Sequence, residues 1–381
     1  MFKKIFSILI IFLVVLSIAG YFFAKPTLLL IVNKQLQKIF KESSVSDLRL
    51  TKDFIEFRGI EIKEGVSYDF KIKEARIYYA LNSILDKKIG KVLFNEVSVK
   101  FNMGKNGLPR LYPFSAETSG VSSKFSIAKF EATNISLDLT RGDIKIKGNV
   151  SLGLDIPTNM VDYIRLNISS LTTNLFQLEG LILNVIQNQD EGEFYIKAIN
   201  YNKLKIGDVV GKSGLKGNIL NISPILVSFL GGNVKGGFNI SLDQDMNYNL
   251  KLNSQSLDVK RFVDDMEFNE KFDMTGRLDG EFSLSGKGQD IKDMKGYFNT
   301  DSNGGILVIK DKTFLENVAK QSNQPLDKLV ESFRNYNYNN GMITLGMESG
   351  NLVLDMKLNG LTGKRNLTVV LHDFKKGKEN P

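Results

Sequence analysis

The feature that most constrains the fold is an alternation of apolar and polar residues between Tyr68 and Asn102. A period of two places successive side chains on opposite faces of a β-strand. A short helical turn is expected over residues 81–88, between two such strands. The stretch therefore predicts two strands that share one apolar face. Its apolar members are Tyr68, Phe70, Ile72, Ala75, Ile77, Tyr79, Val97, Val99 and Phe101.

Most of the chain after residue 45 repeats this pattern in short runs, for example at 135–139, 248–252 and 352–358. Dipeptides typical of tight turns separate the runs. Strands joined by turns, with no long helix between them, indicate antiparallel meanders. We therefore expect a mainly β fold. The turn dipeptides include Asn106-Gly107, Asp279-Gly280 and Asn359-Gly360.

The chain begins with a segment long enough to cross a membrane. Residues 5–24 carry no charge, and twenty helical residues span about 30 Å, the thickness of a bilayer core. Ser17 and Ala19 suit a cleaved signal peptide, whereas apolar residues continuing through Phe23 suit an uncleaved anchor. We favour the anchor, over residues 1–24. The residues assigned to the membrane anchor are Ile5, Leu9, Phe12, Leu16 and Phe22.

Helical periodicity appears in only a few places. Pro26–Phe40 has apolar residues at helical spacing, which predicts an amphipathic helix within residues 25–44. It could lie in lipid headgroups or cap an open end of a sheet, and we favour the cap. A helical insert is expected over 312–334 and a shorter helix near 259–266. The strands would form an N-terminal part, 45–230, and a C-terminal part, 231–381.

The composition argues against an enzyme. The chain has no cysteine and a single histidine, His372, which leaves little from which to build a catalytic triad or a metal site. The segment Gly207–Ser213 ends in Gly-Lys-Ser but is one residue too short for a phosphate loop. The segment Asp243–Tyr248 lacks the glycine of a calcium loop. We therefore expect no catalytic residue, no cofactor and no metal.

The charge pattern bears on the partner. The formal net charge is +8, which suits an anionic partner such as a membrane surface. A nucleic-acid interface would interleave aromatic residues with Lys and Arg on one face. Here Phe and Tyr fall on the face opposite the lysines, as at Phe70 and Lys71. We therefore expect no nucleic-acid partner.

The apolar faces need a cover. Antiparallel sheets usually pack one face on a core and leave the other in water, and the chain has too few amphipathic helices to shield every strand. The sheet must therefore pack on itself, as a sandwich or barrel, or curl into a trough lined by apolar side chains. The sequence alone leaves both arrangements open.

Several segments resemble the AsmA-like family of Gram-negative envelope proteins. They are Pro26–Phe40, Tyr79–Leu85, Leu257–Val259, Gly276–Gly280, Leu284–Gly288, Met294–Gly296 and Gly304–Ile306. The resemblance implies an inner-membrane anchor, a periplasmic body and an elongated β-groove that takes part in moving phospholipid between two membranes. It supplies no catalytic residues. This chain is short for the family, which puts an unaided bridge to the outer membrane in doubt.

We therefore expect an inner-membrane, single-pass protein with an elongated, curled antiparallel β-groove in the periplasm and a few short amphipathic helices. Its ligand would be phospholipid, and its function would be intermembrane lipid transport and outer-membrane lipid homeostasis. A second protein, in the outer membrane or periplasm, would meet the far end. The alternative is a periplasmic scaffold or assembly factor with a dry-packed β-sandwich. The residues expected to contact acyl chains are Phe70, Ile72, Val97, Val99, Phe101, Ile135, Leu137, Leu139, Leu250, Leu252, Leu354 and Met356.

Overall fold

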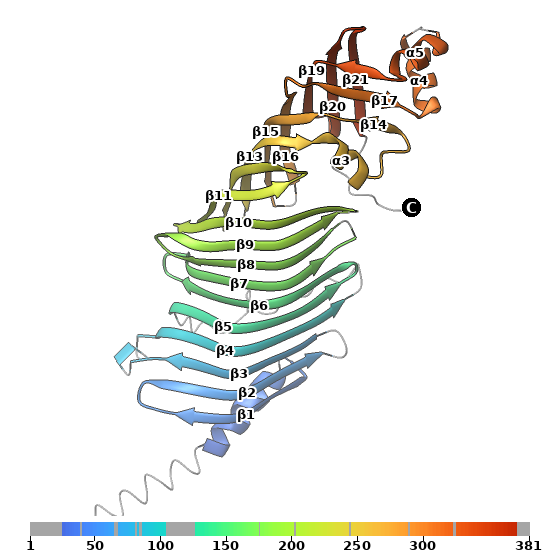
Figure 1. Ribbon diagram of the computed structural model, residues 1–381. Helices are drawn as coiled ribbons and strands as arrows, with labels where there is room; N and C mark the ends of the chain where they lie inside the picture. The colour runs from blue at the N-terminus through green and yellow to red at the C-terminus, as the bar shows by residue number, and fades with distance from the viewer. Residues whose placement is uncertain are drawn as a thin grey trace, which may run out of the picture. The chain divides into compact units, whose positions relative to one another are not determined.

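The computed structural model, whose elements are labelled in Figure 1, divides into two compact units, Met1–Thr172 (unit 1) and Thr173–Pro381 (unit 2). Each unit is described by itself. The division predicted at 230–231 falls at the turn between two strands of unit 2. The residues that the structure describes are 25–38, 40–64, 68–80, 82–83, 86–103, 126–174, 176–201, 203–243, 245–288, 290–322 and 325–371.

Unit 1 is a sheet whose seven strands pair in chain order. The pairs are antiparallel except β4–β5, which is parallel. The purely antiparallel meander predicted for this region is therefore wrong at one point. The strands are β1 Glu42–Leu50, β2 Phe54–Glu64, β3 Tyr68–Tyr78, β4 Lys88–Met103, β5 Ser126–Arg141, β6 Ile144–Asp155 and β7 Met160–Thr172.

A row of irregular residues crosses this sheet and shifts the alternation by one residue. Gly59, Glu96 and Asn134 adopt left-handed backbone conformations at matching heights in β2, β4 and β5. An extra residue in a strand acts as a β-bulge and returns the next side chain to the same face. The β2–β3, β3–β4 and β4–β5 pairings keep their register through this row, and the pairing shifts between β5 and β6. Ile72 and Ala75 of β3 belong to one cluster, although they are three residues apart.

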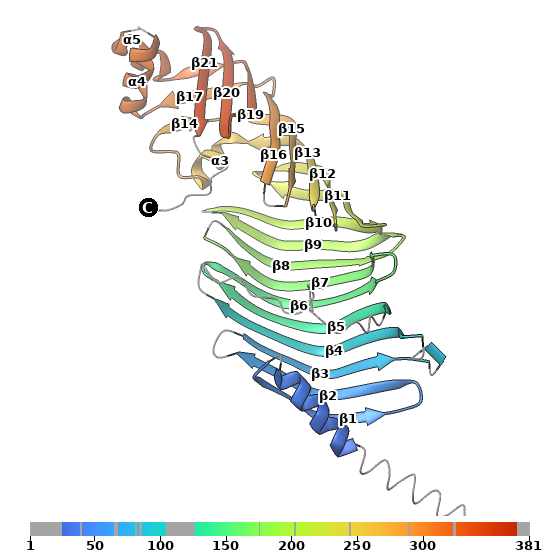
Figure 2. The same cartoon turned by 180° about the vertical axis from the view of Figure 1, so that it is seen from behind.

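A helix over residues 25–38 lies against the first strand (Figure 2). The Asn33 side chain accepts a hydrogen bond from the Val45 N–H at 2.7 Å and donates one to the Val45 carbonyl at 3.0 Å. Gln37 donates to the Ser43 carbonyl at 3.1 Å. These side chains occupy positions that a neighbouring strand would otherwise fill. The prediction that this helix caps an open end of the sheet is confirmed.

Unit 2 contains a larger antiparallel sheet in which the order is β8–β9–β10–β11–β12–β13–β15–β16–β19–β20–β21. Its strands are β8 Gln177–Ile186, β9 Gln189–Tyr201, β10 Leu204–Lys216, β11 Ile219–Phe229, β12 Gly232–Ser241, β13 Asn247–Asp258, β15 Arg277–Lys287, β16 Asp290–Thr300, β19 Asn340–Glu348, β20 Asn351–Gly360 and β21 Gly363–Leu371.

A second layer covers the C-terminal part of this sheet. It consists of a small antiparallel sheet and three helices, as Figure 1 shows near the C-terminal strands. The core between the layers buries Val263, Leu315, Phe333 and Tyr336. The elements of the second layer are α3 Val259–Asp265, β14 Phe272–Met274, β17 Gly305–Ile309, α4 Lys312–Ser322, α5 Leu326–Phe333 and β18 Tyr336–Tyr338.

Two buried tyrosines hold the second layer in place: Tyr336 bonds to the large sheet, and Tyr338 bonds to the residue that follows β14. The Tyr336 hydroxyl lies 3.1 Å from the Leu358 carbonyl and 2.6 Å from the Gly363 carbonyl. The Tyr338 hydroxyl donates to the Thr275 carbonyl. Burial raises the pKa of Tyr338 to about 12, so this hydroxyl keeps its proton and its hydrogen bond at neutral pH. The layer is therefore held by both packing and buried hydrogen bonds.

Several sequence-based expectations can now be compared with the structure. The mainly β fold and the helices expected at 312–334 and 259–266 are confirmed. Asn359-Gly360 does lead into a turn, but Asp279-Gly280 lies inside β15, so that predicted turn is wrong. Gly280 is needed there because a Cβ would come within 2.5 Å of the Phe298 ring.

The predicted anchor, 1–24, lies outside the described residues, as do Asn106-Gly107 and His372. Within the part of the chain that the structure describes, no helix is both long and apolar enough to cross a bilayer. The anchor therefore stays a prediction.

Candidate ligand-binding face

One face of the unit 1 sheet, here called the apolar face, carries apolar residues in register from strand to strand. Two rows run across all seven strands without a polar member. The first row is Leu48, Phe57, Ala75, Phe94, Ala132, Leu152 and Ile164. The second row is Leu50, Ile55, Ile77, Val92, Phe130, Leu154 and Val161.

Further rows lie beyond the row of left-handed residues on the same face. Side chains at directly paired positions lie about 5 Å apart, so each row forms a continuous apolar strip. One further row is Ile62, Phe70, Val99, Leu137, Gly148 and Ile168. Shorter ones are Val45, Ile60, Ile72 and Val97, and Phe101, Leu139, Ile146 and Leu171.

Among the described residues, the cluster at the centre of the apolar face comes from a single layer. Ile72, Ala75 and Val97 are only 3–4% exposed. They form a cluster whose other members, Phe57, Ile60, Phe70, Phe94, Val99 and Ile135, also come from β2–β5. Side chains within one sheet face therefore shield one another there. By contrast, the core of unit 2 joins residues from helices, the small sheet and the large sheet.

Most sequence-predicted site residues fall on this face. Phe70, Ile72, Val97, Val99 and Ile135 belong to one cluster. Phe101, Leu137 and Leu139 extend the same rows in β4 and β5. The site residues predicted for unit 1 therefore all lie in β3–β5.

The remaining predicted residues lie in unit 2. Leu250 pairs with Phe238 and Leu284, so it belongs to an apolar row of the large sheet. Leu252 pairs with Phe282 in the same sheet. Leu354 and Met356 pack against the two-layer core. Protein therefore already covers Leu354 and Met356. The candidate binding site is the apolar face of unit 1.

Sequence analysis missed part of the face in β2 and β4. Phe57 precedes Ile60 by three residues, and Phe94 precedes Val97 by the same interval. A strict period of two assigns the members of each pair to opposite faces. Gly59, between Phe57 and Ile60, was the available signal, since glycine inside a strand often marks a bulge.

The opposite face of unit 1 is charged. Lys73 and Glu96 pair at 2.7 Å, and Lys91 and Glu131 also pair at 2.7 Å. Lys129 and Asp162 pair at 3.2 Å. Such partly exposed pairs contribute little stability each, but they keep this face in water. The sheet therefore has one wet side and one apolar side.

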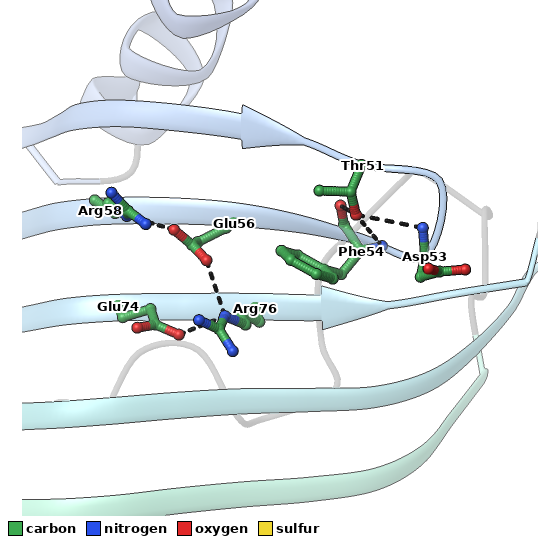
Figure 3. Close-up of polar contacts among 7 residues, drawn as sticks. All are labelled: Thr51, Asp53, Phe54, Glu56, Arg58, Glu74 and Arg76. Atoms are coloured by element: carbon green, nitrogen blue, oxygen red, sulfur yellow. Dashed lines mark hydrogen bonds and ion pairs between the residues drawn. The ribbon is translucent and has the colours of Figure 1, made fainter.

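A buried carboxylate lies within this charged face (Figure 3). Glu56 in β2 is fully buried, and it accepts a hydrogen bond from Arg76 in β3 at 2.9 Å and another from Arg58. Arg76 also lies 2.5 Å from Glu74 and over the Phe54 ring. Burial alone would raise the pKa of Glu56, but the two arginines outweigh burial and hold the pKa below its ordinary value.

This arrangement offers an extended surface for apolar contact. In the described ranges, no group of three or more His, Cys, Asp or Glu side chains is placed to hold a metal ion. Glu56 is saturated by two arginines and faces away from the apolar rows. The chemistry that the face supports is the burial of hydrocarbon.

No family model, curated protein or solved structure matches this chain. The AsmA-like resemblance is therefore carried only by the sequence segments named above, and it stays a prediction.

Proposed function

We propose that the apolar face of unit 1 binds the acyl chains of phospholipids, and that the chain thereby supports lipid transport between the two membranes of a Gram-negative envelope. The observation that carries the proposal is the set of unbroken apolar rows across β1–β7. In this proposal the sheet curls as a groove around the hydrocarbon. The protein is not an enzyme and uses no cofactor.

Energetics favour exchange between a bilayer and such a face. Burying one methylene from water gains about 0.8 kcal/mol, so ten methylenes gain roughly 8 kcal/mol. Association costs several kcal/mol, which offsets much of this gain. An acyl chain that leaves a bilayer exchanges one apolar environment for another, so its transfer to the face needs little net free energy. A carrier with a long apolar face can therefore pass lipid on as readily as it takes lipid up.

The proposed location follows from the N-terminal sequence. Residues 5–24 would anchor the chain in the inner membrane, with the body in the periplasm. The anchor places unit 1 beside a source of phospholipid. A protein in the outer membrane or periplasm would receive the lipid.

Site-specific photo-crosslinking tests the proposal. A photoreactive phenylalanine analogue replaces Leu137 on the apolar face, in the full chain reconstituted in phospholipid vesicles. We expect crosslinks to phospholipid at this position. The matched control is the same replacement at Ser136, the exposed neighbour on the opposite face of β5, where we expect no lipid crosslink.

A second variant makes the test independent of the probe. Val99 pairs directly with Leu137 across β4 and β5, so Val99→Glu places a charge within the same row. We expect it to reduce lipid crosslinking from position 137 several-fold, whereas Lys100→Glu on the charged face leaves crosslinking unchanged. Equal lipid labelling at positions 136 and 137 would contradict the proposal.

The alternative function, a dry-packed scaffold, has one observation in its favour. The second layer of unit 2 shows that this chain can cover a sheet face with its own helices and strands. If a partner protein covers the apolar face of unit 1 in the same way, the analogue at position 137 would crosslink to protein and not to lipid.

A further inference from the structure

The helix over residues 25–38 has one side on the sheet and one side free. The side against β1 carries Asn33, together with the partly buried Leu29, Val32 and Leu36. Lys25 at the start of the helix pairs with Asp47 at 2.6 Å. The cap therefore uses roughly half of the helix surface, and the other half remains to be explained.

The free side is unusually apolar in its first two turns. Leu30 is 56% exposed, Ile31 is 48% exposed and Leu28 is 38% exposed. Leu28 and Ile31 are neighbours at i,i+3 spacing, and Leu30 is exposed on the other side of Ile31. These three side chains are here called the apolar patch, and a group of this kind is less common on protein surfaces than a single exposed apolar residue. The patch has no partner among the described residues that would account for it.

The later turns of the same side are cationic. Lys34 and Lys38 are exposed on the helix, and Lys41 is exposed just after it. At 1.5 Å per residue, Lys34 lies about 4.5 Å and Lys38 about 10 Å further along the axis than Ile31. The free side therefore changes from apolar to positive in the direction away from the N-terminus.

This order matches the chemistry of a membrane surface. Twenty uncharged residues, 5–24, directly precede the helix in the sequence. From the centre of a bilayer outward, the acyl chains are followed by glycerol and then by phosphate. This change from apolar to charged groups extends over a distance similar to the one along the helix. Lysines near a membrane favour anionic headgroups, and a protein surface gives no comparable reason for this axial order.

We propose that the free side of this helix is a membrane contact: Leu28, Leu30 and Ile31 enter the acyl region, and Lys34, Lys38 and Lys41 bind anionic headgroups. The same helix holds the edge of β1 through Asn33, so the contact fixes the first strand of the apolar face at the bilayer surface. This inference concerns the helix and does not depend on whether the apolar face carries lipid.

The chain contains no tryptophan, which permits a direct measurement. Single Leu30→Trp and Ile31→Trp variants of the full chain are reconstituted in vesicles of phosphatidylethanolamine and phosphatidylglycerol. Leu361→Trp is the matched control, because Leu361 is 91% exposed in a turn of unit 2. We expect blue-shifted emission at positions 30 and 31, and quenching by about half or more when brominated acyl chains replace ordinary ones. The control should show neither effect.

The lysines are tested in the Leu30→Trp background. We expect Lys34→Gln with Lys38→Gln to reduce quenching, and vesicles without phosphatidylglycerol to have the same effect. Emission at positions 30 and 31 that matches the control, with no quenching, would overturn the proposal. Shielding from an aqueous quencher without quenching by brominated lipid would also overturn it, because the helix would then contact protein. Failure of crosslinking at position 137 would leave this result untouched.

Discussion

At the scale of single residues, Glu56 is a buried carboxylate on the charged face of unit 1. It is the only charged side chain in the buried class among the described residues. A buried carboxylate is costly unless hydrogen bonds and opposite charges compensate it, and Arg58 and Arg76 supply both. Arg58 lies in β2 beside Glu56, whereas Arg76 lies in β3, so the Glu56–Arg76 hydrogen bond joins the two strands and supports their pairing.

Removing the charge of Glu56 should destabilise unit 1. Glu56→Gln keeps the shape but leaves two arginines without their anionic partner, and we expect a loss of about 1–2 kcal/mol in the free energy of unfolding. The estimate is modest because both arginines are partly exposed to water. Urea unfolding of the variant measures the loss, with Glu61→Gln, a partly exposed surface carboxylate, as the control.

The same carboxylate predicts the sign of a pH dependence. Its pKa in the folded protein lies below the ordinary value of 4.5. The ionised form therefore stabilises the fold, fully above the unfolded pKa and progressively less as the pH falls through the folded pKa. We expect the difference in stability between the original chain and Glu56→Gln to shrink on acidification below about pH 4.5. A difference that stays constant down to the acid transition would contradict this assignment.

The alternation of apolar and polar residues predicts side-chain faces correctly within a regular strand and incorrectly where a strand is irregular. Alternation correctly placed Phe70, Ile72 and Val99 on one face, because pleating alone determines that result. It could not place Phe57 with Ile60 or Phe94 with Val97, because the shift accompanies left-handed conformations in β2, β4 and β5. Of the residues in this row, Gly59 and Asn134 are of types that adopt the left-handed conformation readily, whereas Glu96 is not.

At the scale of elements, the edge of β1 is satisfied by side chains rather than by a strand. Asn33→Ala removes both hydrogen bonds to the Val45 backbone. We expect faster hydrogen exchange at the Val45 amide and a loss of about 1–2 kcal/mol, because a covered backbone donor and acceptor lose their partners. Gln35→Ala, at an exposed position of the same helix, is the control and should change neither. Unchanged exchange at Val45 in Asn33→Ala would show that the helix does not protect this edge.

The connections between elements were harder to predict than the elements themselves. The predicted hairpin at Asn106-Gly107 implies antiparallel β4 and β5, yet these strands run parallel. Parallel strands need a connection of about a dozen residues or more, and residues 104–125 supply that length. A turn-forming dipeptide is a local signal, so it does not report where a long connection delivers the next strand.

At the scale of the whole molecule, the two units treat an apolar sheet face differently. In unit 2 the C-terminal strands are covered by α3–α5 and the small sheet. In unit 1 the apolar cluster draws only on neighbouring strands of one layer. The sequence indicated that helices were too few to cover every face, but it did not indicate which face they cover. That choice depends on long-range packing, as between Leu354 of β20 and the second layer.

This difference predicts a local response to lipid. A ligand that binds only the folded state slows exchange through local unfolding, by about a hundredfold at a hundred times its dissociation constant. We expect a monomeric short-chain phosphatidylcholine to slow amide exchange in β2–β5 and to leave β14, β17 and β18 unchanged, since protein already occupies that side of unit 2. Glycerophosphocholine, which has the same headgroup and no acyl chains, should change neither region. Equal slowing in both regions would show that the lipid does not select the apolar face. Slowing by glycerophosphocholine would assign recognition to the headgroup instead of the hydrocarbon.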